Sequence, residues 1–254
     1  LASGQAVILK TDGTVAAITG VTEGAGTPVV FENARSDSCS AVYDSSNNKV
    51  VITYTDLGNS YYGTAVVGTV SGASISFGTP VVFESATVNA TTATFDSNLN
   101  KVVIAYGDGG NSYYGTSIVG TVSGTSISFG TAVVFENASA TNLGSTFDSN
   151  RNRVVLSFRD VGNSNKGTAV VGTVSGTSIS FFTAVVFETA AVSGNTAPVF
   201  DTANNKVVIA YRDEGNSSYG TAIVGTISAG GNLSFGTAVV FNNSSSDEIG
   251  SAFD

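Results

Sequence analysis

Carboxylates are the side chains of this chain best suited to chemistry, and most of them recur at three fixed positions. Two carboxylates can act as general acid and general base only where different surroundings tune them apart. An acid repeated in every copy of a unit does not meet this condition, and an Asp beside a tight turn hydrogen-bonds the turn backbone. We therefore expect these acids to be turn caps and strand-end residues, and we predict no catalytic residue and no enzyme activity. Thirteen of the nineteen acidic residues follow the pattern: an Asp after an aromatic residue (Asp44, Asp96, Asp148, Asp201, Asp254), the Asp of an Asp-x-Gly-Asn-Ser motif (Asp56, Asp108, Asp160, Asp213), and a Glu after Val-Val-Phe (Glu32, Glu84, Glu136, Glu188).

The composition excludes further catalytic and metal-binding chemistries. The 254 residues include no histidine, so no histidine-based triad can form. Cys39 is the only cysteine, which excludes cysteine clusters for zinc or iron–sulfur and any intrachain disulfide. The Asp-x-Gly-Asn-Ser motif carries too few carboxylates for a calcium loop. We predict no metal and no cofactor.

The charge balance narrows the class of partner. The formal net charge is −9, and only 11% of the residues are charged, against roughly 25% in an average soluble domain. A net negative charge argues against nucleic acid and anionic membranes as partners. No apolar run approaches the ~20 residues that a membrane span needs, so we expect no membrane insertion. Gly, Ser, Thr and Asn dominate the polar positions, and we predict an extracellular or virion-surface location.

An internal repeat organises the sequence. Asp-x-Gly-Asn-Ser and the aromatic-Asp pair recur with the same spacing as Val-Val-Phe, and periods of 40–50 residues are typical of helical arrays or propeller blades. Val-Val-Phe ends at Phe31, Phe83, Phe135, Phe187 and Phe241, in steps of 52, 52, 52 and 54 residues.

The local pattern of one unit indicates strands. Its four runs are rich in Val, Ile, Thr, Tyr and Phe, which fit a pleated sheet better than a helix. Turn residues separate the runs, and no stretch keeps a helical apolar period for three turns. In the second unit we expect the first to fourth strands at Thr92–Asp96, Lys101–Tyr106, Tyr114–Val122 and Ser126–Glu136.

Four antiparallel strands in each of five units predict an all-β, closed five-bladed β-propeller. The N-terminal residues fit the second, third and fourth strands of a unit (Gln5–Lys10, Thr14–Thr19, Thr27–Glu32), and Ile249–Asp254 fits a first strand. Pairing of the C-terminal strand with the N-terminal strands would close the ring and remove two exposed sheet edges. We therefore predict one domain, 1–254, with blades at about 38–84, 90–136, 142–188, 195–242, and 249–254 plus 5–32.

Candidate ligand-binding residues lie where the units differ. The connections from the fourth strand to the next unit vary most, and we expect them to be loops on the same propeller face as the Asp-x-Gly-Asn-Ser turns. Binding sites concentrate in such variable loops on a rigid scaffold. Tyrosines beside Asn, Ser and Thr are typical of sugar or protein contacts, although these rings could instead pack against neighbouring blades. The variable connections are 33–40, 85–93, 137–145, 189–198 and 242–252, and the candidate residues are Tyr61, Tyr62, Tyr113, Tyr114, Lys166, Tyr219 and Arg35.

The Asp-x-Gly-Asn-Ser turns resemble a known hairpin. The sequence from Asp56 to Tyr61 resembles the Asp-box of sialidase-type propellers, which reads Ser/Thr-x-Asp-x-Gly-x-Thr/Ser-aromatic, with Tyr54 in place of the leading Ser or Thr. The Asp-box is a structural hairpin clamp, so the resemblance implies a fold and not an activity. The turn residues it designates as structural are Asp56, Gly58, Asp108, Gly110, Asp160, Gly162, Asp213 and Gly215.

Two further resemblances bear on function. Five blades of about fifty residues resemble the architecture of tachylectin-type lectins, whose blades bind amino sugars. The repeated Asn-Lys-Val-Val-Ile-Ala-Tyr and Gly-Thr-Ala-Val-Val-Gly-Thr-Val-Ser-Gly resemble propeller repeats in structural proteins of tailed phages. The stretch 6–15, Ala-Val-Ile-Leu-Lys-Thr-Asp-Gly-Thr-Val, is similar to segments of phage tail and fibre proteins.

These observations predict a non-catalytic, surface-displayed structural and recognition module, part of a phage virion, that binds a glycan or a protein through one propeller face. Other virion or surface proteins are the further partners expected. One alternative is a free secreted lectin with repeated sugar sites. Another is an Asp-box glycoside hydrolase, but a sialidase needs three converging arginines, and only Arg35 lies outside a repeated or turn position.

Overall fold

The computed structural model describes residues 7–9, 14–17 and 26–253. It is an all-β antiparallel protein, which confirms the all-β part of the predicted fold class. The predicted strand residues 5–6, 10 and 18–19, and Asp254, lie outside the described residues.

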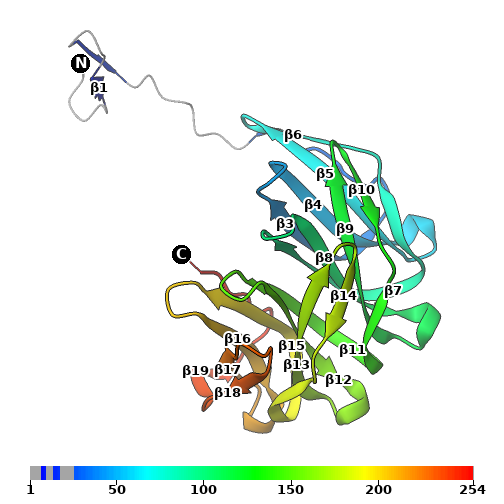
Figure 1. Cartoon of the computed structure of the whole chain (residues 1–254), viewed down its shortest axis with the longest axis vertical. Helices are drawn as coiled ribbons and strands as arrows, with labels where there is room; N and C mark the ends of the chain where they lie inside the picture. Colours follow the sequence, from blue (N-terminus) through cyan, green and yellow to red (C-terminus); the bar gives the residue numbers. More distant parts are fainter. Residues whose placement is uncertain (1–6, 10–13, 18–25, 254) are drawn as a thin grey trace.

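Each full unit folds as one antiparallel sheet (Figure 1). In the first, β4 (Lys49–Asp56) pairs with β3 (Ser36–Asp44) on one side and β5 (Tyr62–Ser71) on the other. The end of β5 pairs with β6 (Ser74–Phe77), and its start pairs with β7 (Val81–Asp96). The fourth strand of the unit is therefore broken into two pieces, both of which lie along the third strand.

The next three units repeat this arrangement. The second contains the end of β7, then β8 (Lys101–Asp108), β9 (Tyr114–Ser123), β10 (Ser126–Phe129) and the start of β11 (Val133–Asp148). The third contains the end of β11, then β12 (Arg153–Asp160), β13 (Lys166–Ser175), β14 (Ser178–Phe181) and the start of β15 (Val185–Asp201). The fourth contains the end of β15, then β16 (Lys206–Asp213), β17 (Tyr219–Ile227), β18 (Leu233–Phe235) and β19 (Val239–Ser245).

The connections between these units are strands and not the loops that the sequence predicted. β7, β11 and β15 run for 16, 16 and 17 residues, pairing with one sheet at their start and with the next sheet at their end. Each ladder is interrupted by a register shift, between Asn89 and Thr92 in β7 and between Thr141 and Gly144 in β11. A β-bulge of this kind bends a strand and increases its local twist, so one strand can pass from sheet to sheet without a loop.

A left-handed residue marks the bulge in each unit. Most residue types avoid this conformation, because Cβ approaches the carbonyl oxygen that follows it. The same conformation recurs after β19, so the C-terminal segment bends as the other units do. The residues with positive φ at these bends are Ser38 (49°), Ala90 (49°), Asn142 (56°), Gly194 (62°) and Glu248 (51°).

The core lies between successive sheets. Val103 and Val119 of the second unit form one buried cluster with Val154, Leu156 and Val170 of the third. Aromatic pairs also join neighbouring units: the Phe83 and Tyr106 rings lie 5.1 Å apart, and equivalent pairs recur at 5.0–5.3 Å. The interior is therefore built from contacts between neighbours in the repeat.

The sheet of the fourth unit keeps one apolar face uncovered. Val224 is 46% exposed and Phe241 is 57% exposed, although both belong to positions that the next unit covers elsewhere. The equivalent valines are nearly inaccessible: Val67 (1%), Val119 (0%) and Val171 (1%). The equivalent phenylalanines are buried (Phe83, 8%; Phe187, 7%) or half-buried (Phe31 and Phe135).

The predicted fifth blade is not seen in the described residues. β1 (Val7–Leu9) and β2 (Val15–Ala17) pair with one another in a two-stranded sheet. Residues 249–253 carry no strand, and no pairing joins them to β1 or β2 within the part of the chain that the structure describes. Closure of the ring and the predicted blade boundaries therefore stay predictions.

Candidate functional site

One cavity of about 690 Å³ collects residues from all five units. Its wall consists of the bulges and the residues beside them. We call it the bulge cavity, lined by residues within 38–40, 89–92, 141–145, 195–198 and 249–251. All five segments fall inside the connections that vary most in the sequence.

Side-chain hydrogen bonds join neighbouring segments of the wall. The Thr196 hydroxyl donates to the Asn142 carbonyl oxygen at 2.8 Å, and the Ser251 hydroxyl donates to the Ala197 carbonyl oxygen at 3.0 Å. Thr91 makes the same bond to the carbonyl oxygen of Ser38. Residues 249–251 thus lie beside the end of β15, although they form no ladder with it.

The bulge cavity is polar but uncharged. None of the described residues that line it is acidic or basic, and most carry hydroxyl, amide or small apolar side chains. Such a wall can hydrogen-bond a neutral ligand, but it offers no ionic anchor and no general acid or base.

The Asp-x-Gly-Asn-Ser turns lie next to these segments. Each turn is a short 3₁₀ segment, and the Asp56 carboxylate accepts a hydrogen bond from the Asn59 backbone N–H at 3.1 Å. The Tyr61 carbonyl oxygen accepts from the Val88 backbone N–H at 3.0 Å, which ties the turn to the next inter-unit strand. The other copies are the 3₁₀ segments Gly109–Asn111, Val161–Asn163 and Glu214–Asn216, in which Asp108, Asp160 and Asp213 accept at 2.9–3.1 Å.

The turn glycines allow close packing. A Cβ atom on Gly58 would lie 2.5 Å from the Cβ of Ala34, so a larger residue would displace the inter-unit segment. Equivalent contacts occur at Gly110 (2.9 Å to Ala86), Gly162 (2.4 Å to Ala138) and Gly215 (2.4 Å to Ala190).

The candidate ligand-binding residues lie outside the bulge cavity. Tyr61 and Tyr113 are 51% and 40% exposed on the turns, whereas Arg35 is exposed and forms an ion pair with Asp37 at 3.0 Å. The half-buried candidates occupy the first positions of the third strands. These residues are Tyr62, Tyr114, Lys166 and Tyr219, and none of the seven candidates lines the cavity.

The sequence therefore pointed to the connections that contain the cavity residues, but not to those residues as ligand-binding candidates. The signal that could have found them was the variability of the inter-unit connections, whose residues form the wall. Because the sequence predicted loops there, it did not show that the five connections converge on one cavity.

A buried tyrosine–glutamate contact recurs in the first, second and fourth Asp-x-Gly-Asn-Ser units. The Tyr106 hydroxyl donates to Glu84 at 3.2 Å, and Tyr54 and Tyr211 donate to Glu32 and Glu188 at 3.1 and 3.0 Å. Burial, followed by the nearby Asp108 carboxylate, raises the pKa of Glu84 above its ordinary value.

The third unit lacks this hydroxyl because Phe158 replaces the tyrosine. Burial and the nearby Asp160 carboxylate raise the pKa of Glu136, which no described tyrosine contacts. None of these carboxylates lines the bulge cavity.

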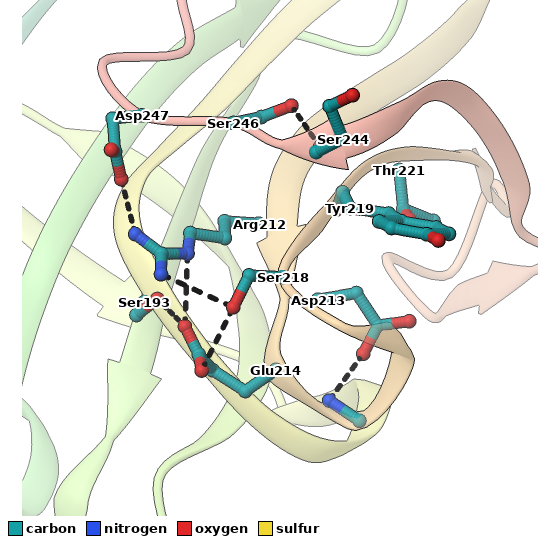
Figure 2. A network of polar contacts seen from close by, with 11 residues as sticks. Ser193, Arg212, Asp213, Glu214, Ser218, Tyr219, Thr221, Ser244, Ser246 and Asp247 are labelled. Atoms are coloured by element: carbon teal, nitrogen blue, oxygen red, sulfur yellow. Dashed lines mark hydrogen bonds and ion pairs between the residues drawn. The ribbon is translucent and has the colours of Figure 1, made fainter.

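A polar network fixes the segment after β19 to the turn of the fourth unit (Figure 2). Arg212 pairs with Glu214, Nε to Oε1 at 3.0 Å, and with Asp247. Ser193 and Ser218 also donate to Glu214, the latter at 3.2 Å, and the bond from Ser193 is the main cause of the lowered pKa of Glu214. The network fixes the position of Asp247, which precedes Gly250 of the cavity wall by three residues in the sequence.

No three His, Cys, Asp or Glu side chains within the described ranges are placed to hold a metal ion. Those ranges also contain no helix long and apolar enough to cross a lipid bilayer.

No protein-family model matches the chain, and the comparison with curated proteins gave no match. Among solved structures, the chain is similar to one described as the SapL1 lectin in complex with alpha methyl fucoside. The sequence identity is 13% and the TM-score is 0.49, over 81% of this chain. The matched region spans 63% of the length of that lectin.

Proposed function

We propose that the chain closes into a five-bladed β-propeller that acts as a non-catalytic, surface-displayed recognition module. It binds a glycan or a protein through the face that carries the Asp-x-Gly-Asn-Ser turns and the bulges. The observation that carries the proposal is the convergence of all five variable segments on one uncharged cavity.

Three features support a fifth blade. The bond from Ser251 to the Ala197 carbonyl oxygen joins the same two repeat positions as the hydroxyl contact between Ser145 and Thr92, so 249–251 follow β15 as one unit follows another. The exposed Val224 and Phe241 form the surface that a further unit would cover. The N-terminal residues 5–32 carry the sequence pattern of the three strands that this unit needs.

Recognition is favoured over catalysis by the chemistry of the cavity wall. Small-molecule sites are concave and use a few polar groups to orient the ligand. Here hydroxyl and amide groups are present, but no carboxylate, imidazole or ammonium group lies among the described lining residues. A secreted lectin with equal sugar sites fits less well, because the third strand starts with Tyr62, Tyr114, Lys166 or Tyr219.

The virion setting is proposed from the sequence, through its resemblance to phage structural repeats and its Ser-, Thr- and Asn-rich surface composition. Mass spectrometry of purified particles from a producing culture tests it. Peptides of this chain should co-purify with particles through a density gradient, and their presence only in the soluble fraction would contradict the proposal.

Binding is tested on an array of immobilised glycans, and in parallel on surface proteins extracted from candidate host cells. We expect the wild-type chain to bind at least one of these classes. The double variant Tyr61→Ala, Tyr113→Ala removes the two exposed turn tyrosines without altering the bulge cavity. An absence of binding to both classes would contradict a recognition function.

A further inference from the structure

We infer that the bulge cavity is a single binding site for one neutral, hydroxyl-bearing small molecule that presents one apolar edge. This inference rests on the proposed recognition function and specifies its site and ligand class. A volume of about 690 Å³ lies within the roughly 300–1,000 Å³ range of small-molecule sites.

The wall favours a neutral ligand. Taking an ion out of water requires a compensating charge or several strong hydrogen bonds. No charged side chain is present among the described lining residues, so a carboxylate or ammonium ligand would lose hydration without a partner.

The wall offers both acceptors and donors. The Ser251 hydroxyl already donates to the Ala197 carbonyl oxygen, which leaves its lone pairs free to accept. The side-chain amides of Asn142 and Asn195 can donate, and neither has a hydrogen-bond partner among the described residues. A ligand hydroxyl group can both donate and accept, so a polyol matches this mixture.

The wall is also asymmetric. Equivalent bulge positions carry Cys39, Thr91 and Asn195 in the first, second and fourth units but Leu143 and Ile249 in the third and fifth. Pro198 adds apolar surface beside Leu143, because its ring contacts the position where a Cβ of Gly144 would lie. Leu143, Pro198 and Ile249 therefore offer apolar surface to a methyl group or a C–H face, whereas other parts of the wall offer hydroxyl and amide groups. The five segments are not equivalent, which excludes five equal sites.

A matched pair of sugars tests the apolar edge. L-Rhamnose and L-mannose differ only at C6, where rhamnose has a methyl group and mannose a hydroxymethyl group. We expect isothermal titration calorimetry and saturation-transfer NMR to detect one site per chain and at least tenfold tighter binding of rhamnose. Equal affinities, or a stoichiometry of several sites, would overturn the inference.

A matched pair of variants tests the location. Gly250 lines the cavity and a Cβ there meets no atom within 4 Å, so Gly250→Phe fills the cavity without a clash at Cβ. Gly230→Phe is the control, because its nearest neighbours lie 3.9 Å from the added Cβ and it does not line the cavity. Binding should fall at least tenfold in Gly250→Phe and stay unchanged in Gly230→Phe. Unchanged binding in Gly250→Phe would overturn the inference.

Cys39 supplies a second readout. It is exposed, lines the cavity and is the only thiol of the chain. Saturating rhamnose should slow the alkylation of Cys39 by iodoacetamide at least threefold, as measured by mass spectrometry. An unchanged rate would contradict occupancy of the cavity.

The outcomes distinguish a failure of the cavity inference from a failure of the proposed function. If an arrayed glycan binds and is lost in Tyr61→Ala, Tyr113→Ala but kept in Gly250→Phe, the cavity inference is overturned and the proposed function stands. If the wild-type chain binds no glycan and no protein, both are overturned.

Discussion

The missing hydroxyl of the third unit allows a direct test of what stabilises the turns. In three units a fully buried tyrosine donates to the glutamate after Val-Val-Phe, at 3.0–3.2 Å. Phe158 occupies the same position and is also fully buried, so Glu136 has no such donor. The Phe135 and Phe158 rings lie 5.3 Å apart, against 5.1 Å for Phe83 and Tyr106, so a hydroxyl added to Phe158 would reach Glu136 as Tyr106 reaches Glu84.

We expect Phe158→Tyr to raise the free energy of unfolding by about 1–2 kcal/mol at pH 7, because a hydrogen bond to a charged group contributes about 1.5–3 kcal/mol and burying the hydroxyl offsets part of it. The reciprocal variant Tyr106→Phe should lower it by about 1–3 kcal/mol, since it leaves the half-buried Glu84 without its donor. Urea unfolding measures both, as shifts in midpoint at unchanged slope.

The pH dependence gives the sharper test. The pKa of Glu136 is raised in the folded chain above its ordinary value of 4.5, so its contribution to stability is present below pH 4.5 and is lost as pH rises through the folded pKa. The added hydroxyl stabilises the ionised carboxylate and lowers that pKa. The gain from Phe158→Tyr should therefore be seen at pH 7 and disappear at pH 3. No gain at pH 7, or an equal gain at both pH values, would refute the reasoning.

Three further predictions concern single contacts. Gly194→Ala should lower the free energy of unfolding, measured in urea, by about 1 kcal/mol, because φ of Gly194 is 62° and the added Cβ meets no other atom. An unchanged urea midpoint would contradict a backbone cause. Gly63→Ala should lower the free energy of unfolding by about 1–3 kcal/mol in the same assay, because the new Cβ would lie 2.4 Å from the Phe83 ring. A neutral effect would show that the ring can move. Arg212→Gln should lower the free energy of unfolding by about 1 kcal/mol or less at low salt and by almost nothing in 1 M NaCl, because the Asp247 side chain is 69% exposed. A loss of stability that salt does not reduce would contradict an ionic origin.

The strands of each unit were predictable because their causes are local. β-Branched residues and Asx turns act within a few residues, so the expected Lys101–Tyr106 and Tyr114–Val122 coincide with β8 and β9 to within two residues. The break in the fourth strand was not predicted. It falls at Gly130, where a Cβ would lie 1.9 Å from the carbonyl oxygen of Thr177 in the next unit, a contact that no local pattern encodes.

The sequence by itself determined the repeat, the all-β class and the turn chemistry, because alternation of side chains and Asp-backbone bonds depend on near neighbours along the chain. Only the tertiary structure decided that the inter-unit connections are strands with bulges and that residues about 52 positions apart share one cavity. The reason is the register: a shift between Thr141 and Gly144 sets where β11 bends, and that bend depends on pairing with two different sheets at once. Thr196 and Asn142 meet for the same reason, since neighbouring bulges are brought together by the packing of whole sheets.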